Sequence, residues 1–258
     1  MAALITGASS GIGLELARIF AENGHDVVLV ARSEGKLQTL ASELQSRGRV
    51  RTHVIASDLS VPGAAQTLVE RVTGLGVEID ALVNNAGYGV YGPFLETSLE
   101  TELAMIQLNI VALTELTKRL LPPMVARKRG RILNLASTAA FLPGPLMAVY
   151  YATKAYVLSF SEAIANELEG TGVTVTALCP GPTASGFQAA AKLEESKLVA
   201  GKTLPSSREV ARAGYDALMH GTRVFVPGLT NKVTVQLPRV FPRSVITKVV
   251  RNVQERRR

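Results

Sequence analysis

Short runs of β-branched and aliphatic residues alternate with longer segments of helical periodicity along most of this chain. This alternation is typical of a parallel sheet whose strands are joined by crossover helices. Most of the runs are continuously apolar, as expected for strands that are covered by helices on both faces. A chain of 258 residues is long enough for one large α/β domain and too short for two with separate cores. We therefore predict a single doubly wound α/β domain with a mostly parallel, seven-stranded sheet.

The pattern also gives approximate bounds for the elements. The expected strands are Ala3–Thr6, Val27–Ala31, Arg51–Ser57, Ala81–Asn84, Gly130–Ala136, Thr174–Leu178 and Arg223–Val226. The expected helices are Ile12–Asn23, Gly35–Arg47, Gly63–Thr73, Leu99–Ala126, Tyr151–Leu168 and Ser207–Met219. Irregular stretches follow three of the strands, at residues 87–97, 138–149 and 181–205. Ligands bind at the carboxyl ends of strands in open α/β sheets, so we expect these loops to form the binding site.

Composition excludes several classes of protein. The chain is 47% hydrophobic and 19% charged, with a mean hydropathy of +0.21, which indicates a compact globule and not a disordered chain. Its apolar stretches are shorter than the roughly 20 residues of a membrane span, and its first residues lack the basic segment of a secretory signal. The single cysteine, Cys179, is expected to be a small buried hydrophobe in a reducing compartment. We expect a cytoplasmic protein that holds no metal.

The first expected strand ends in a glycine-rich turn that leads straight into an amphipathic helix, Thr6-Gly7-Ala8-Ser9-Ser10-Gly11-Ile12-Gly13. Such a turn lets the backbone approach a pyrophosphate and points free N–H groups and the positive helix end at it. The spacing is G-x-x-x-G-x-G and differs from G-x-G-x-x-G, and a turn that only permits tight packing is the alternative. We interpret it as a dinucleotide cradle formed by Gly7, Ser9, Ser10, Gly11, Ile12 and Gly13.

The end of the second expected strand indicates which dinucleotide is bound. An acid there would bind the ribose hydroxyls of NAD, whereas an arginine can accommodate the 2′-phosphate of NADP. No acid occurs before Glu34, and Arg32 stands at the strand end. With the hydroxyls of Ser9 and Ser10 in the preceding turn, Arg32 favours NADP(H), and NAD(H) is left open. A solvated charge at the helix entry is the alternative for Arg32.

Polar residues also follow the third and fourth expected strands. Asp58 follows the third, and Asn84-Asn85-Ala86-Gly87 ends the fourth. Alone, such residues are typical of turns, where they cap neighbouring backbone groups. Beside a dinucleotide cradle they can also hold an adenine and its ribose. We therefore expect five further residues at the cofactor site: Asp58, Leu59, Asn85, Ala86 and Gly87.

Tyr150 and Lys154 lie four residues apart at the start of an expected helix, so both side chains project from one face. A phenol with a pKa near 10 is a poor general base at neutral pH, and an adjacent ammonium favours the phenolate. In isolation such a pair is an ordinary surface pair. Its surroundings favour a chemical role, because Ser137 ends the preceding strand and can donate a hydrogen bond to a substrate oxygen. Asn109 lies inside an expected helix among apolar residues and needs a structural or functional reason.

The ordered set of these motifs resembles the classical short-chain dehydrogenase/reductase family, and the resemblance covers about residues 2–228. The set comprises Thr6-Gly7-x-x-x-Gly11-x-Gly13, Asn84-Asn85-Ala86-Gly87, Asn109, Ser137, Tyr150-x-x-x-Lys154 and Cys179-Pro180-Gly181. The resemblance implies a Rossmann-like fold with Tyr150 as catalytic acid/base and Ser137 as the donor that orients the carbonyl. It also implies Lys154 as ribose ligand and partner that lowers the Tyr150 pKa, and Asn109 as holder of a water in a proton relay. Three residues would lie beside the nicotinamide: Pro180, Gly181 and Thr183.

The implied activity is NADP(H)-dependent hydride transfer between a nicotinamide and a carbonyl or alcohol. In reduction, Ser137 and Tyr150 polarise the carbonyl and Tyr150 gives up its proton. The alternatives are a non-enzymatic NADP-binding redox sensor or regulatory protein on the same fold, and an epimerase or dehydratase that retains its nicotinamide. The resemblance also implies a homodimer or homotetramer built on the helices Leu99–Ala126 and Tyr151–Leu168.

The loops that should form the pocket are rich in apolar residues, which favours a hydrophobic ketone, aldehyde or 3-oxoacyl substrate. These residues are Tyr88, Tyr91, Phe94, Leu95, Phe141, Leu142, Leu146, Met147, Phe187, Leu193, Leu198 and Val199. Packing in the core is the alternative for them. We assign residues 1–238 to the catalytic domain and residues 181–205 within it to a substrate lid.

Residues 239–258 form a basic amphipathic extension, with seven basic residues and one acid, Glu255. Because the basicity is concentrated there, we expect no nucleic-acid surface across the fold. An apolar stripe is formed by Val245, Ile246, Val249, Val250 and Val253. Such a segment could contact an anionic membrane surface, a partner subunit or its own domain, and the sequence leaves these three open.

Overall fold

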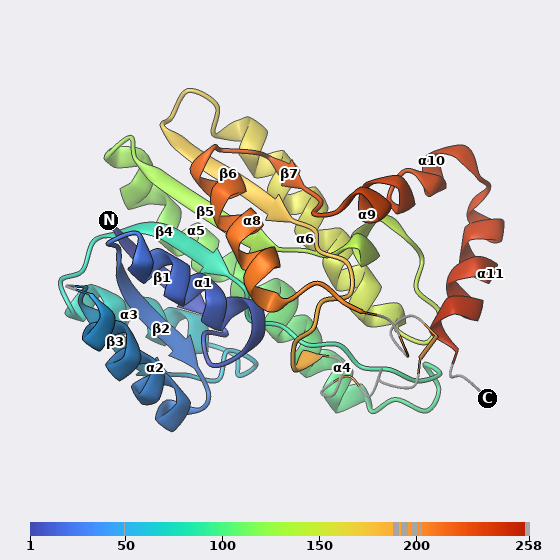
Figure 1. Ribbon diagram of the computed structural model, residues 1–258, viewed down its shortest axis with the longest axis horizontal. Coiled ribbons are helices and arrows are strands. Elements are labelled where there is room, and N and C mark those ends of the chain that lie inside the picture. The colour runs from blue at the N-terminus through green and yellow to red at the C-terminus, as the bar shows by residue number, and fades with distance from the viewer. Residues whose placement is uncertain (49, 188–190, 192–195, 198–200, 202, 256–258) are drawn as a thin grey trace.

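Seven parallel strands form one sheet in the computed structural model, which describes residues 1–48, 50–187, 191, 196–197, 201 and 203–255. The strand order is β3-β2-β1-β4-β5-β6-β7, so the chain starts in the middle of the sheet and winds outward on both sides (Figure 1). This order confirms the predicted doubly wound, Rossmann-like sheet. The strands are β1 (Ala2–Thr6), β2 (Asp26–Ala31), β3 (Thr52–Ala56), β4 (Ile79–Asn84), β5 (Gly130–Leu135), β6 (Val173–Leu178) and β7 (Val224–Phe225).

Helices cover both faces of the sheet. One core cluster joins the sheet to α1 (Gly11–Glu22), α2 (Glu34–Arg47) and α8 (Ser207–Met219). A second joins it to α3 (Ala64–Gly74), α5 (Leu113–Ala126) and α6 (Ala148–Glu167). In β1, Ala3 and Ile5 belong to the first cluster, and Ala2 and Leu4 belong to the second. Successive side chains thus enter opposite cores, which is why the strand is continuously apolar.

Two of the expected helices differ from the structure by more than a shift of one residue at an end. The expected helix Leu99–Ala126 consists of α4 (Leu99–Ile106), the π-helical segment η1 (Gln107–Ala112) and α5. The expected helix Tyr151–Leu168 is α6, which begins at Ala148, so that Tyr150 lies in its first turn. Wider π-helical turns occur mostly as local distortions, often at functional sites, and here the distortion contains the buried Asn109.

The last helices lie beyond the carboxyl ends of the strands (Figure 1): α9 (Leu229–Thr234), α10 (Leu237–Val240) and α11 (Arg243–Gln254). Ile246, Val250 and Gln254 of α11 are buried, whereas Val245 and Val249 are exposed. The expected single stripe is therefore divided, because adjacent positions on a helix point about 100° apart. Through its buried face the extension packs against its own domain. Among the described helices, none is long and apolar enough to cross a bilayer.

A buried ladder of polar side chains crosses the second core between the sheet and the helices. Asn84 Nδ2 donates to Asn134 Oδ1 at 2.9 Å and to Thr117 Oγ1 at 3.0 Å. Asn134 Nδ2 donates in turn to Ser161 Oγ at 2.9 Å, which links β4 and β5 to α6. A buried amide costs free energy unless its hydrogen bonds are made, so this ladder fixes how α5 and α6 sit on the strands.

We expect Asn134→Ala to lower the free energy of unfolding by about 2–3 kcal/mol. Asn134 is fully buried, and its loss leaves the amide of Asn84 and the hydroxyl of Ser161 each short of one partner. Urea unfolding followed by circular dichroism measures the change. The matched control is Asn166→Ala, which removes an exposed hydrogen bond to Glu169 and should change stability by less than about 0.5 kcal/mol. Equal losses of stability in the two variants would show that the buried ladder stabilises the fold no more than an exposed hydrogen bond does.

Candidate active site

The glycine-rich turn between β1 and α1 is folded tightly against the end of β4. Gly7 and Gly11 have φ angles of +67° and +57°, in the left-handed region that favours glycine. A Cβ at Gly7 would lie 2.6 Å from Asn85 Nδ2. Asn85 holds this approach, since its Nδ2 donates to the Thr6 carbonyl at 2.9 Å and its N–H donates to Thr6 Oγ1 at 3.0 Å. The turn therefore has no room for a side chain at Gly7 and is held in place by the hydrogen bonds of Asn85.

The start of α1 suits a phosphate group. The first helical hydrogen bond runs from Leu14 N–H to the Ser10 carbonyl at 3.2 Å, so the preceding N–H groups have no acceptor within the helix. The first turn contains no acidic residue that would neutralise the positive end of the helix. Free N–H groups, a positive helix end and glycines without side chains together fit the pyrophosphate of a dinucleotide.

Two polar side chains lie at the neighbouring strand ends. Arg32 is exposed after β2, and Asp58 follows β3. Burial acts to raise the pKa of Asp58, but hydrogen bonds from Ser60 and the charge of Arg32 outweigh it, so the pKa is lowered. The Asp58 carboxylate accepts from Ser60 N–H at 3.0 Å and from Ser60 Oγ at 2.6 Å. Leu59, in contrast, buries its side chain in the core and offers only backbone atoms to a ligand.

Tyr150, Lys154 and Ser137 come together at the carboxyl end of β5. Lys154 Nζ donates to the Leu135 carbonyl at 2.6 Å and lies 5.8 Å from the centre of the Tyr150 ring. Burial raises the pKa of Tyr150 above its ordinary value, and a hydrogen bond with Ser137 offsets only part of that rise. Burial also lowers the pKa of Lys154, to about 8. The enclosure thus disfavours the charged form of both groups.

Asn109 lies on the other side of Lys154, against Gly87. Its Nδ2 donates to the Tyr88 carbonyl at 3.0 Å and to Thr153 Oγ1 at 3.1 Å. A Cβ at Gly87 would lie 2.9 Å from Asn109 Oδ1 and 3.6 Å from Lys154 Nζ. The glycine therefore leaves room for both polar groups beside the backbone. The amide itself lies buried in the π-helical segment.

The segment after β6 closes the site on the side of Ser137. Ser137 Oγ donates a hydrogen bond to the Pro180 carbonyl at 3.3 Å. The same oxygen accepts from Ala139 N–H and so caps the short helix η2 (Thr138–Phe141). Gly181 packs against Asn231, and Thr183 Oγ1 donates to the Gly181 carbonyl at 2.9 Å. Cys179 is buried, and burial raises the pKa of its thiol to about 12. The structure therefore places the Pro180 carbonyl beside Ser137.

An apolar cluster surrounds Tyr150. The ring of Phe187 lies 5.3 Å from the ring of Tyr150, centre to centre. Gly89 is packed between the two rings and Met147, where a Cβ would lie within 3.1 Å of each. Of the residues expected in the pocket, five belong to this cluster: Tyr88, Tyr91, Leu142, Met147 and Phe187.

Other residues expected in the pocket lie elsewhere. Phe94 and Leu95 are exposed, at 65% and 98%, because the loop after β4 turns them outward. Phe141 packs in a separate cluster between β5, β6 and α6. Leu193, Leu198 and Val199 lie outside the described residues, as does much of the expected lid, residues 188–190, 192–195, 198–200 and 202.

The sequence did not indicate that the last helix reaches the site. Gln254 Nε2 donates to the Tyr151 hydroxyl at 2.6 Å, and Tyr91 donates to the Gln254 carbonyl at 2.9 Å. Tyr151 packs edge-on against Tyr150, with ring centres 6.0 Å apart. Burial raises the pKa of Tyr151 to about 12, and the Gln254 amide offsets part of the effect. The sequence signal for this contact was the four-residue spacing that places Gln254 on the same helix face as Ile246 and Val250.

The chain belongs to the short chain dehydrogenase family, whose model matches residues 1–196. Its named relatives include reductases of 3-oxoacyl-CoA and ketoacyl groups, and the similar solved structures include alcohol and hydroxysteroid dehydrogenases. This membership confirms the family and the fold that the sequence predicted, and the named relatives agree with the predicted enzyme class.

Three relatives illustrate the similarity. The human very-long-chain 3-oxoacyl-CoA reductase is 38% identical over 184 residues, which cover 69% of this chain and 58% of the relative. Ketoacyl reductase HetN of Nostoc sp. is 33% identical over 239 residues, covering 92% of this chain and 82% of the relative. The structure of a short-chain dehydrogenase from Sphingobium yanoikuyae in complex with NADPH has a TM-score of 0.81 and 33% identity, with 88% of each chain covered. Several curated relatives are longer, and the chain spans 52–60% of their length.

The buried lysine predicts an unusual pH dependence of stability. Between pH 8 and the ordinary lysine pKa of 10.5, the folded protein holds Lys154 neutral while the unfolded chain keeps the proton. The unfolded state then binds more protons, so the free energy of unfolding rises with pH, by at most about 3 kcal/mol. The raised pKa of Tyr150 acts oppositely above pH 10, where the unfolded tyrosine ionises first and stability falls.

Urea unfolding of the wild type and of Lys154→Met between pH 7 and 10 isolates this contribution. The difference in stability between the two should shift in favour of the wild type as the pH rises through 8. The control is Lys118→Met, at an exposed position of α5, whose difference from the wild type should not change with pH. A constant difference for Lys154→Met would contradict the lowered pKa.

Proposed function

We propose that this chain is an NADP(H)-dependent carbonyl reductase or alcohol dehydrogenase in which Tyr150 is the catalytic acid/base. The observation that carries the proposal is the hydrogen-bonded pair of Tyr150 and Ser137, enclosed by apolar side chains with the Lys154 ammonium beside the ring. Two O–H donors that converge in an enclosed site suit the oxygen of a carbonyl group. This intact set also disfavours a purely regulatory NADP-binding protein.

In the reductive direction, Ser137 and Tyr150 donate hydrogen bonds to the carbonyl oxygen and polarise it. The bound nicotinamide supplies the hydride. Tyr150 then releases its proton to the developing alkoxide, for which its protonated state at neutral pH is suitable. Lys154 stabilises the resulting phenolate and, with Asn109 on its other side, is in position to restore the proton through a water. Oxidation follows the same steps in reverse.

Cofactor binding is assigned to four sets of residues. Backbone N–H groups from Gly11 to Gly13 hold the pyrophosphate, with Gly7, Ser9 and Ser10 forming the rest of the turn. Arg32 and the two serines bind a 2′-phosphate, which supports NADP(H) over NAD(H). Asp58, Leu59 and Asn85-Ala86-Gly87 line the adenine and ribose, while Pro180, Gly181 and Thr183 lie beside the nicotinamide. The NADPH found in the Sphingobium yanoikuyae structure supports this preference.

The substrate is proposed to be a hydrophobic ketone, aldehyde or 3-oxoacyl compound. Phe187, Met147 and Leu142 around Tyr150 would pack against an apolar chain. The names of the human and Nostoc relatives, both reductases of ketoacyl or 3-oxoacyl groups, support the acyl class.

We also propose a homodimer or homotetramer in the cytoplasm, built on α4, η1, α5 and α6. Large apolar side chains on these helices are exposed in the single chain, among them Leu99 at 71%, Leu103 at 55% and Val111 at 41%. Exposed apolar patches on a helical face commonly mark subunit contacts. Packing against a second copy would remove these apolar side chains from water, which is favourable.

Replacing Tyr150 by Phe is expected to lower kcat by about 10²–10⁴-fold, the contribution of a positioned general acid. The assay follows net consumption of NADPH, and in parallel NADH, with a panel of ketones, aldehydes and 3-oxoacyl thioesters. Net consumption also separates a reductase from an epimerase that regenerates its cofactor. The control is Tyr215→Phe, which removes a buried phenol that bonds His25 on the opposite face of the sheet. Full turnover by Tyr150→Phe would disprove the catalytic assignment.

Arg32→Ala should raise the KM for NADPH by about 10-fold or more and leave the KM for NADH within about 2-fold. The reason is that only NADPH carries the phosphate that a guanidinium at the end of β2 can bind. The matched control is Arg47→Ala at the other end of α2, which should change neither value. A parallel loss for both cofactors would show that Arg32 acts on the fold and not on the 2′-phosphate.

A further inference from the structure

A mixed apolar and basic surface is formed by α9, α10 and α11. Six apolar side chains are exposed there, Leu229 (79%), Val233 (58%), Val240 (75%), Phe241 (49%), Val245 (44%) and Val249 (52%). Five basic residues lie among them: Lys232, Arg239, Arg243, Lys248 and Arg251. No acidic residue occurs between Asp216 and Glu255. We call these eleven residues the C-terminal patch.

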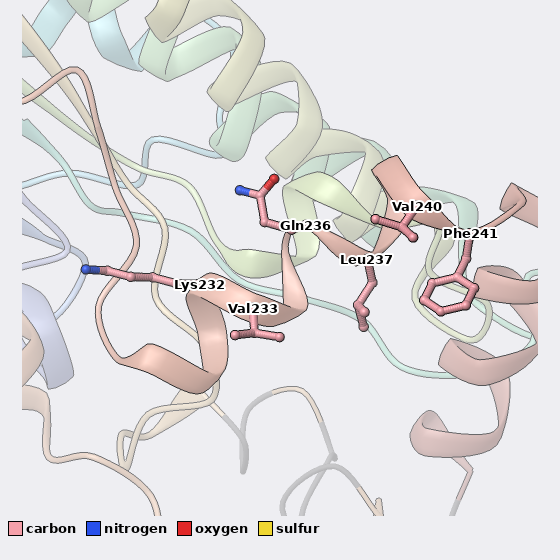
Figure 2. A pocket seen from close by; sticks show the side chains of 6 residues that line it. All are labelled: Lys232, Val233, Gln236, Leu237, Val240 and Phe241. Atoms are coloured by element: carbon pink, nitrogen blue, oxygen red, sulfur yellow. The ribbon is translucent and has the colours of Figure 1, made fainter.

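The patch includes a shallow groove of about 560 Å³. Its lining is formed by Lys232, Val233, Gln236, Leu237, Val240 and Phe241. Figure 2 shows Val233, Leu237 and Phe241 extending to the same side of the α9–α10 segment, with Lys232 at its margin. An apolar surface bordered by cations is thus continuous across more than one helix.

Four of the five basic residues of the patch have no ion-pair partner in the part of the chain that the structure describes. Among the described residues, no carboxylate forms an ion pair with Lys232, Arg239, Arg243 or Lys248, and only Arg251 has one, with Glu255 at 3.5 Å. Elsewhere on the surface, arginines such as Arg18, Arg208 and Arg223 pair with carboxylates. The patch therefore presents a local positive field together with exposed apolar groups.

We propose that the C-terminal patch docks on a lipid bilayer that carries anionic headgroups. In an interfacial segment, apolar side chains enter the boundary of headgroups and acyl chains while Lys and Arg reach the phosphates. The sequence provides this alternation, since Val240 and Phe241 lie between Arg239 and Arg243, and Lys248 precedes Val249. Each nearby Lys or Arg strengthens attraction to an anionic leaflet.

A second copy of the chain fits this surface poorly. Symmetric dimers bring the same patch of both subunits together, so two sets of five cations would face each other, and among the described residues only Glu255 forms an ion pair with one of them. An anionic bilayer, in contrast, complements both the charge and the apolar groups.

Docking would bring the bilayer close to the candidate active site. The buried face of α11 packs against the cluster around Tyr150 and Tyr151, while its exposed face belongs to the patch. One helix diameter, about 10 Å, therefore separates that cluster from the surface. The docking proposal does not depend on the proposed enzymatic function, because its test measures binding without turnover.

The test is sedimentation of the full chain with vesicles of phosphatidylcholine alone and of phosphatidylcholine with 30% phosphatidylglycerol. We expect binding to the anionic vesicles only, and weaker binding as NaCl is raised. Arg239→Gln/Arg243→Gln/Lys248→Gln should lower the partition coefficient on the order of 100-fold. Val245→Gln/Val249→Gln should lower it about 10-fold, because these side chains no longer enter the bilayer.

Matched controls separate the patch from general charge and hydrophobicity. Lys36→Gln/Lys118→Gln/Lys128→Gln removes three exposed cations elsewhere and should change binding far less than the patch variant. Val61→Gln/Leu75→Gln removes apolar side chains of similar exposure, 53% and 43%, and should leave binding unchanged. The proposal is overturned by absence of binding to anionic vesicles, by equal binding to neutral vesicles, or by equal effects of patch and control variants. If the patch variants no longer formed dimers and the wild type did not bind vesicles, the patch would be a subunit contact. That result would also overturn the proposal.

Discussion

A single buried cation connects the helix that carries the candidate site to the sheet beneath it. Lys154 Nζ donates to the Leu135 carbonyl at 2.6 Å, at the carboxyl end of β5. A buried ammonium is costly without a partner, so this contact fixes the orientation of α6 on the strand. Ser137 follows the same strand closely, and Tyr150 precedes Lys154 by one helical turn. Fixing one contact therefore brings both hydroxyl groups to the same point.

The parts of the fold and site that depend on local sequence could be predicted. Continuous apolar runs indicated strands buried on both faces, and the four-residue spacing put Tyr150 and Lys154 on one side of a helix. Contacts between distant residues could not be predicted, because they depend on how elements pack. Asn85 closing over Gly7 and Gln254 reaching Tyr151 are of this kind. The contacts of the Asn109 side chain are also of this kind, since it donates to the Tyr88 carbonyl and to Thr153 Oγ1, which lie in separate parts of the chain.

The C-terminal helix shows how one short segment can have two roles. Its sequence pattern suggested one wide apolar stripe, but packing uses only Ile246, Val250 and Gln254. Val245 and Val249 lie on the other side of the helix and remain exposed. A helix that needed only to cover the site would gain from polar residues at these two positions. Their apolar character is therefore better explained by a second surface than by the fold alone.

The enclosure of the site also bears on the direction of the reaction. Burial raises the pKa of Tyr150 and lowers that of Lys154 to about 8, so at neutral pH the phenol keeps its proton and the amine is still mostly charged. Donation to a carbonyl oxygen needs this protonated phenol, whereas oxidation of an alcohol needs the phenolate. The apolar cluster that would hold a hydrophobic substrate is also what disfavours the phenolate. The packing that would hold an apolar substrate therefore also keeps Tyr150 in the protonated form that donation to a carbonyl oxygen requires.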